Sequence, residues 1–220
     1  MRGLGFSIFV FAAALVLLAP PAHAASSAFD QATELEIDAM DLQQKGDLDG
    51  AVAKHRQAVQ IYPQSKAFKQ NCAQALNDAG VAKYQAKDYA TAIALFQEAL
   101  ANVPGFDRAK INLSLVQGDQ FNGEGMALFK NGDFAGAVEK FKQALAAEPG
   151  YKNATVNRDA AEAEIALKAS DFATAVAKLQ EAVSIASTPF LLDKLAKAQA
   201  SLAAQQAAAE AEKQKQPKSQ

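Results

Sequence analysis

The chain of 220 residues lacks tryptophan and contains a single cysteine, seven prolines and twelve glycines. Because Cys72 has no second cysteine to pair with, the fold must hold by packing and not by an internal disulfide. Alternating runs of β-branched and aromatic residues, which are typical of strands, are also absent. Alanine instead occurs in nearly every segment, beside residues that lose little free energy on entering a helix. The composition therefore predicts an all-α protein.

Neither sign of charge dominates, since 22 Lys and Arg residues face 24 Asp and Glu residues. This balance offers no general attraction to the phosphates of nucleic acids, so no nucleic-acid partner is expected. The sequence also lacks the CxxC, HExxH, GxSxG and Gly-rich phosphate-loop patterns. We therefore expect neither an enzyme nor a protein that carries a metal or another cofactor.

The first 24 residues differ from the rest of the chain. Arg2 precedes an apolar run at 6–18, and Ala-His-Ala at 22–24 supplies the small residues that a signal peptidase requires. The run is shorter than the roughly 20 residues of a membrane span. No cysteine comes directly after the cleavage site, so a lipoprotein is not expected. We interpret 1–24 as the signal peptide of a periplasmic bacterial protein without a membrane span after cleavage. A retained N-terminal anchor is the alternative.

Four segments of the remaining chain align without gaps. Each has an Asp, an apolar residue directly after it, an Ala three residues further on, a larger residue four later and a second Ala three later. In three of them a Pro follows five residues after the second Ala. The first Ala residues are Ala51, Ala92, Ala137 and Ala175, and the larger residues are His55, Phe96, Phe141 and Leu179.

This spacing predicts pairs of helices that stack. Offsets of four and three residues keep one stripe on a single helical face, where small Ala residues admit a neighbouring helix. The Gly-Asp pair before the stripe ends one helix and caps the next, and Pro stops the second helix. Because no single pair can bury its apolar face alone, successive pairs must pack on one another.

The pattern resembles the tetratricopeptide repeat over roughly residues 32–190. In the third segment it reads Gly125, Phe129, Gly132-Asp133-Phe134, Ala137, Phe141, Ala144, Pro149. The resemblance implies a right-handed α-solenoid of about four helical hairpins within 25–211, with units at about 27–63, 64–104, 105–149 and 150–187. A capping helix is expected at 188–211, starting at Thr188-Pro189, and a disordered tail at 212–220. Ser27 is a candidate cap for the first helix.

The repeat length departs from the family. Tetratricopeptide units recur at about 34 residues, whereas the first Ala residues here are 41, 45 and 38 residues apart. The excesses of 7, 11 and 4 residues are close to two, three and one helical turns. We interpret them as extensions of the first helix of each pair, because whole turns keep the apolar face in register. Gly118 in the longest extension indicates either close packing or a kink.

The resemblance also implies a binding surface. In the family, an Asn of the first helix faces a concave groove and can bind an extended peptide. On this chain these positions are Asn71, Asn112 and Asn157, with Gln74, Arg108 and Asn153 on neighbouring turns. The alternative is that the Asn residues bridge helices within the stack. The paired Lys and Arg that some members use for carboxylate termini do not appear.

The expected function is that of an exported scaffold for a protein or peptide partner of the bacterial envelope. A binder of a small ligand or glycan, and a component that self-assembles through its Ala-rich C-terminal helix, are the alternatives. His55, at a position that other units give to Phe or Leu, and Cys72 are interpreted as packing residues without catalytic roles.

We predict that the exported protein begins at Ala25. N-terminal sequencing and the intact mass of protein from a periplasmic fraction check this. Ala24→Leu should block processing, because signal peptidase requires a small residue there. Recovery of the unprocessed chain from membranes would instead support a retained anchor.

Overall fold

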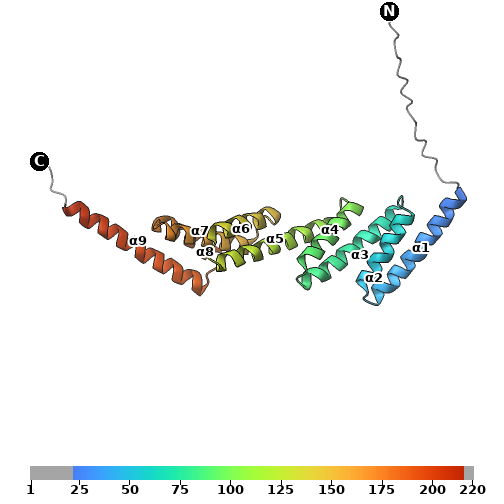
Figure 1. Ribbon diagram of the computed structural model, residues 1–220, viewed down its shortest axis with the longest axis horizontal. Coiled ribbons are helices and arrows are strands. Elements are labelled where there is room, and N and C mark those ends of the chain that lie inside the picture. Colours follow the sequence, from blue (N-terminus) through green and yellow to red (C-terminus); the bar gives the residue numbers. More distant parts are fainter. Residues whose placement is uncertain (1–21, 216–220) are drawn as a thin grey trace, which may run out of the picture.

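The computed structural model describes residues 22–215, with side chains from 27 to 214. In this range the chain is helical throughout except for short turns, and it contains no strand. Four helical hairpins follow one another along an elongated molecule, and a last helix closes the row (Figure 1). The helices are α1 (Ala22–Gln44), α2 (Leu48–Ile61), α3 (Lys66–Gln85), α4 (Tyr89–Asn102), α5 (Asp107–Lys130), α6 (Phe134–Ala147), α7 (Lys152–Lys168), α8 (Phe172–Ile185) and α9 (Pro189–Lys215). We call α1, α3, α5 and α7 the first helices and their partners the second helices.

Each second helix begins at the Asp that the repeat pattern marks. The Asp carboxylate accepts a hydrogen bond from the backbone N–H three residues further on, which satisfies a donor that the helix leaves unpaired. The distances are 2.9 Å at Asp47, 3.2 Å at Asp88, 2.9 Å at Asp133 and 3.1 Å at Asp171. The residue before each Asp has a positive φ, which is 82° at Gly46, 62° at Lys87, 79° at Gly132 and 58° at Ser170. The predicted turn is confirmed, and two units build it without Gly.

Within the hairpins, small residues face large ones. The Ala residues of the repeat stripe are fully buried in all four second helices. A Cβ atom added to Gly80 or Gly125 would lie 2.6 Å from Cε1 of Phe96 or Phe141, respectively. Both rings are 0% exposed. The first helix therefore approaches its partner so closely that the Phe ring occupies the space of a missing side chain.

The lengths of the first helices confirm that the extra residues extend them. All four second helices have 14 residues, whereas α3, α5 and α7 have 20, 24 and 17. These three lengths differ by the same steps as the excesses of 7, 11 and 4 residues. Helix α5 continues through Gly118, where an added Cβ would lie 2.9 Å from Oε2 of Glu148. Close packing, and not a break, accounts for this glycine.

The ends of the chain correct two expectations. Helix α1 begins at Ala22, so Ser27 lies inside it and does not cap it. Helix α9 starts at Pro189, with Thr188 Oγ1 accepting a hydrogen bond from the Leu191 N–H at 3.3 Å, and continues to Lys215. Residues 212–215 are therefore helical and do not belong to a disordered tail, because Ala, Glu, Lys and Gln all favour continuing the helix. Nearly all of the predicted signal peptide, and residues 216–220, lie outside the described range.

The hydrophobic core is divided along the row of helices. One buried cluster extends from Val52 of α2 to Val116 of α5, and separate clusters surround Phe141 of α6 and Leu179 of α8. Helix α5 crosses the middle of the molecule between these parts (Figure 1). Its residues 117–124 are polar or Gly except for Phe121. The two halves of the solenoid are thus joined through a largely polar stretch of one helix.

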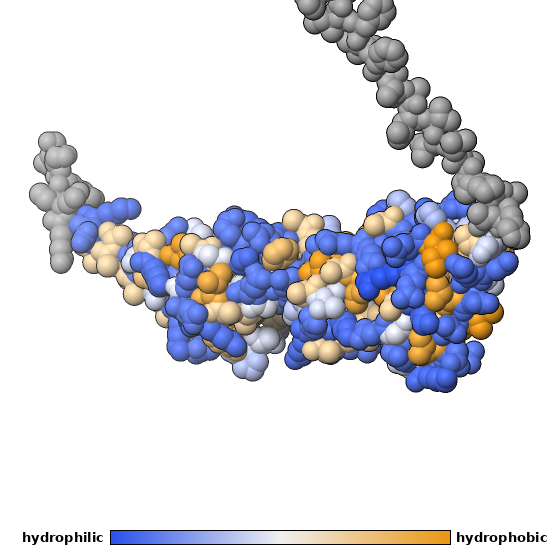
Figure 2. Space-filling view, turned by 45° about the vertical axis from the view of Figure 1, so that its right-hand side comes forward, coloured by the Kyte–Doolittle hydropathy of each residue, from blue (hydrophilic) through white to orange (hydrophobic). Residues whose placement is uncertain are grey.

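The surface is hydrophilic over most of the visible face, with apolar residues concentrated at the N-terminal end (Figure 2). Exposed large apolar side chains of α1 include Ile37 and Met40, which are 62% and 48% exposed. No preceding unit is available within the described residues to cover them. No helix between residues 22 and 215 is both long and apolar enough to cross a membrane.

Two glycines of α5 should respond to alanine in opposite directions. Gly125→Ala should lower the free energy of unfolding by about 1–3 kcal/mol, because the buried Phe141 ring cannot move away. Gly123→Ala should raise it by up to about 1 kcal/mol, since nothing lies within 4 Å of the added Cβ and Ala favours helix. Urea denaturation followed by circular dichroism measures both. Stabilisation by Gly125→Ala would contradict the close approach.

Candidate functional site

The three predicted Asn residues bridge neighbouring first helices. Nδ2 of Asn71 donates to Oε2 of Glu36 on α1 at 2.6 Å. Nδ2 of Asn112 and of Asn157 donate to Oδ1 of Asn77 and of Asn122, at 2.8 Å and 2.9 Å. In all three pairs the partners are 35 residues apart in sequence. We call these pairs the Asn ladder. The structure therefore shows the geometry of the second interpretation, in which the Asn residues bridge helices within the stack.

The constant separation has a geometric cause. Each donor is the sixth residue of its helix, and each acceptor lies eight residues before the end of the preceding first helix. Because the turns and the second helices between them have the same lengths, these two positions always meet. The extra residues of α3 and α5 therefore lie between a donor and the next acceptor, where they leave the ladder in register.

The first rung of the ladder includes the histidine that replaces Phe or Leu. Nδ1 of His55 lies 2.8 Å from Oε1 of Glu36, whose other oxygen accepts from Asn71. His55 and Glu36 are 1% and 4% exposed. Burial raises the pKa of the nearby Cys72 thiol to about 12, which keeps it protonated and a poor nucleophile at neutral pH. This geometry fits the interpretation of both residues as packing residues.

The other predicted binding residues lie outside the ladder, and of these Arg108 and Asn153 are exposed while Gln74 is half-buried. Nη1 of Arg108 on α5 lies 3.5 Å from Oε1 of Gln74 on α3, and Gln74 also donates to Asp78 at 2.8 Å. Asn153 is exposed in the first turn of α7, four residues before Asn157. The structure thus brings Gln74 and Arg108 together and places Asn153 apart from them. The role of these residues in binding stays a prediction.

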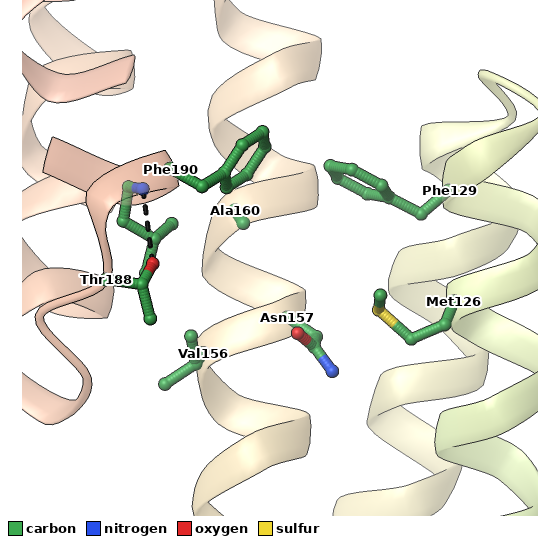
Figure 3. Close-up of a pocket in the computed structure, with 8 residues that line it drawn as sticks. Met126, Phe129, Val156, Asn157, Ala160, Thr188 and Phe190 are labelled. Carbon is green, nitrogen blue, oxygen red and sulfur yellow. Dashed lines mark hydrogen bonds between the residues drawn. The ribbon is translucent and has the colours of Figure 1, made fainter. Parts of the chain in front are cut away.

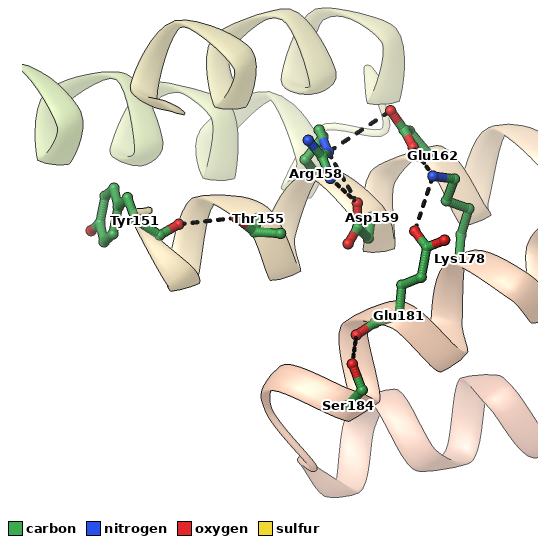
Figure 4. A network of polar contacts seen from close by, with 8 residues as sticks. All are labelled: Tyr151, Thr155, Arg158, Asp159, Glu162, Lys178, Glu181 and Ser184. Atoms are coloured by element: carbon green, nitrogen blue, oxygen red, sulfur yellow. Dashed lines mark hydrogen bonds and ion pairs between the residues drawn. The ribbon is translucent and has the colours of Figure 1, made fainter. Parts of the chain in front are cut away.

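A charged network ties α7 to α8 (Figure 4). The guanidinium of Arg158 lies 2.7 Å from Oδ1 of Asp159, which is 1% exposed. Lys178 of α8 lies 3.1 Å from both Glu162 and Glu181. Burial raises the pKa of Asp159, while the neighbouring cations act against that rise. Because each carboxylate has a cation beside it, the network is satisfied internally and offers no free reactive group.

An apolar pocket lies between α5, α7 and α9 (Figure 3). Its volume is about 160 Å³. Most of the lining is apolar, and Asn157 and Thr188 supply polar groups. The lining residues are Met126, Phe129, Val156, Asn157, Ala160, Thr188, Phe190 and Leu191. Phe190 is 53% exposed, so the pocket opens beside a large apolar ring on the surface.

The pocket arises where the ladder ends. Helix α9 occupies the place of a next first helix, but its sixth residue is Lys194, which reaches Glu164 at 2.5 Å. The residue of α7 at the acceptor position, eight before the helix end, is Ala160. Ala160 is smaller than Glu36, Asn77 and Asn122, which occupy the acceptor position at the other steps. Sequence analysis missed this pocket, although Ala at the acceptor position was a readable signal.

Metal binding finds no support in the described part of the chain. Among its residues no group of three or more His, Cys, Asp or Glu side chains could hold a metal ion.

Two tetratricopeptide repeat family models match the chain, at residues 39–104 and 122–191. Together they span more than half of it, and the observed hairpins have the helical architecture that the family predicts. The chain therefore belongs to the tetratricopeptide repeat family. No curated protein matches it.

Several solved structures are similar to this chain at low sequence identity. A tetratricopeptide repeat protein from Bacteroides fragilis is 15% identical, with a TM-score of 0.50, and the match covers 77% of this chain and 98% of that one. A Thermus thermophilus repeat protein is 17% identical, with a TM-score of 0.29 over 78% of this chain and 82% of that one. The yeast Sti1 TPR2AB domain in complex with an HSP90 peptide is 17% identical, with a TM-score of 0.32 over 79% and 84%.

The ladder predicts a stability difference between two Asn residues. Asn112→Ala should be less stable than Asn153→Ala by about 1–2 kcal/mol, because it leaves Asn77, which is 4% exposed, without its donor. Both substitutions replace Asn by Ala on a first helix, and of the two residues only Asn112 belongs to the ladder. Thermal unfolding followed by calorimetry measures the difference. Equal stabilities would show that the rung contributes nothing to the fold.

Proposed function

We propose that this protein is an exported scaffold that holds a protein or peptide partner of the bacterial envelope on its first helices. Tetratricopeptide repeat proteins generally mediate protein–protein interactions. The observation that carries the proposal is the apolar pocket between α5, α7 and α9, which opens beside the exposed Phe190. Export is supported by the signal-like segment at 1–24.

The pocket fits one apolar side chain of a partner. The aromatic rings and methyl groups that line the pocket would cover that side chain. Burial of a Val, Leu or Phe side chain contributes about 1.5–3 kcal/mol of favourable free energy. Asn157 uses its Nδ2 in the ladder, so its carbonyl oxygen can still accept a hydrogen bond from a partner's backbone. Arg108 and Asn153, both exposed, would contact more distant parts of the partner. In this proposal Asn71 and Asn112 act by fixing the spacing of the helices.

The size of the pocket favours a protein partner over a small ligand. Its volume is about 160 Å³, whereas ligand sites usually measure roughly 300–1,000 Å³. The mainly apolar lining also provides few of the polar groups that a glycan requires. One side chain from a larger partner suits the space better than a whole ligand does.

Substitution of Phe190 tests the proposal. Phe190→Ser should reduce recovery of the partner by about tenfold, because an aromatic anchor at a pocket dominates binding. Leu192→Ser is the matched control, since Leu192 is 46% exposed on the same helix and does not line the pocket. Quantitative mass spectrometry of proteins captured from periplasmic extract measures both. Equal recovery by the two variants, or no specific capture by the folded wild-type protein, would refute the proposed role of the pocket.

A further inference from the structure

The side of α1 that faces away from the other helices carries a row of exposed apolar side chains. Phe29, Ile37 and Met40 are 45%, 62% and 48% exposed. Thr33 lies on the same face, so the row follows steps of four, four and three residues. The opposite face of α1 is buried, because Ala32 packs in one cluster with residues of α2 and α3. We call the row of four residues the α1 stripe.

A row of carboxylates runs directly beside the stripe. Each stripe residue is followed in sequence by an acidic residue, so the two rows lie side by side along the helix. All four acidic residues are exposed, and they are Asp30, Glu34, Asp38 and Asp41. Between residues 27 and 44 the chain has no Lys, Arg or His. Apolar patches bordered by hydrophilic surface are visible at this end of the molecule (Figure 2).

Two of the carboxylates have a cation of the same chain beside them. Lys54 of α2 pairs with Asp38, and Lys45 of the following turn pairs with Asp41. The side chains of Asp38 and Asp41 remain 57% and 56% exposed in these pairs. Ion pairs as exposed as these are weak, so a cation of a partner can share or replace them.

The other two carboxylates have no such cation. Among the described side chains no ion pair includes Asp30 or Glu34. Helix α3 contacts the start of the stripe through an aromatic ring, whereas its Lys66 and Lys69 line a hollow at the end of α4. The free side of α1 is therefore negatively charged along its length, which favours a basic partner.

The place of α1 in the row indicates that this partner is a helix. Every other first helix packs against the second helix that precedes it, whereas the described residues contain no helical hairpin before α1. From Phe29 to Met40 the stripe extends over about three helical turns, or roughly 16 Å. A helix lying along α1 can cover the stripe with its own apolar face and place basic side chains opposite the carboxylates.

The same charges argue against other occupants. A second copy bound through its own α1 would bring two rows of carboxylates together, and an anionic membrane surface would be repelled. Helix α9 of a second copy would offer mainly Ala between residues 196 and 211. Its Lys194 and Lys197 are already paired with Glu164 and Asp193. A different, basic protein fits the surface better than these occupants do.

We propose that the α1 stripe and its carboxylates dock a basic amphipathic helix of a partner protein. Apolar side chains of that helix cover Ile37 and Met40, and its Lys or Arg side chains pair with the carboxylates of Asp30 and Glu34. This surface lies at the opposite end of the row from the pocket beside Phe190 and shares no residue with it (Figure 1). The docking therefore does not depend on the function proposed for that pocket.

Two fluorescent peptides of about 18 residues test the proposal, with Leu at helical spacing in both and either Lys or Glu at all other positions. Fluorescence anisotropy measures their binding to the processed protein, which begins at Ala25. The Leu-Lys peptide should bind at least about tenfold more tightly than the Leu-Glu peptide. Ile37→Ser should weaken its binding by about tenfold. Asp30→Asn combined with Glu34→Gln should weaken it by about three- to tenfold and reduce its dependence on salt.

Matched variants separate this surface from a general attraction of the peptide. Glu210→Gln combined with Glu212→Gln removes the same two charges from exposed positions of α9 and should leave the affinity unchanged. Ile185→Ser, at a side chain of α8 that is 41% exposed, is the control for Ile37→Ser and should also have no effect. Circular dichroism checks that each variant is folded. Met40→Ser, at a 48% exposed side chain, replaces Ile37→Ser if that variant does not fold.

Several outcomes would overturn the proposal. They are the absence of saturable binding of the Leu-Lys peptide, equal binding of the Leu-Glu peptide, and equal losses in the variants of α1 and in their controls. A wild-type dimer in light scattering that Ile37→Ser converts to a monomer would assign the stripe to self-association instead. Phe190→Ser should leave the affinity of the peptide unchanged, so a failure at α1 is distinguishable from a failure at the pocket.

Discussion

The structure depends on the constant length of its second helices. Each has 14 residues, begins at an Asp that caps it, and packs a buried side chain into its partner. The end of every second helix therefore lies at the same distance from the turn that joins it to its first helix, whatever the length of that first helix. The Asn ladder follows from this constancy, because the chain always returns to the preceding first helix after 35 residues.

The long α5 buries different faces in its two halves. Ala109 and Val116 pack into the core of the N-terminal half, whereas Gly125 and Phe129 pack towards α6 and α7. Between them Asp119 accepts hydrogen bonds from the hydroxyls of Tyr84 and Tyr151. The hydrogen bond from Tyr84 raises the pKa of that residue to about 12. A helix that changes its buried face along its length has no single apolar stripe. This explains why the extension was recognised by its length and not by its hydrophobic pattern.

The sequence predicted the features that depend on local spacing. The Asp caps, the order of the hairpins and the extension of the first helices all follow from intervals between Ala, Asp and Pro. The partners of the Asn residues could not be predicted, because they depend on which residue of a neighbouring helix lies opposite. The pocket could not be predicted either. It forms where Ala160 occupies the acceptor position of α7 and where α9 has Lys194, which pairs with Glu164, in place of an Asn donor. Ser27 misled the prediction, since the helix-favouring residues before it extend α1 beyond a plausible cap.

The polar middle of α5 has a mechanical consequence. Residues 117–124 contain one apolar side chain, Phe121, whose ring centroid lies 5.4 Å from Nζ of Lys140. Bending there would expose little apolar surface, but it would strain the hydrogen bonds that Asp119 accepts from Tyr84 and Tyr151. A partner that grips both arms would stiffen the rod and lose part of its binding free energy to the entropy of that stiffening. A partner confined to one arm would leave the bending motion untouched.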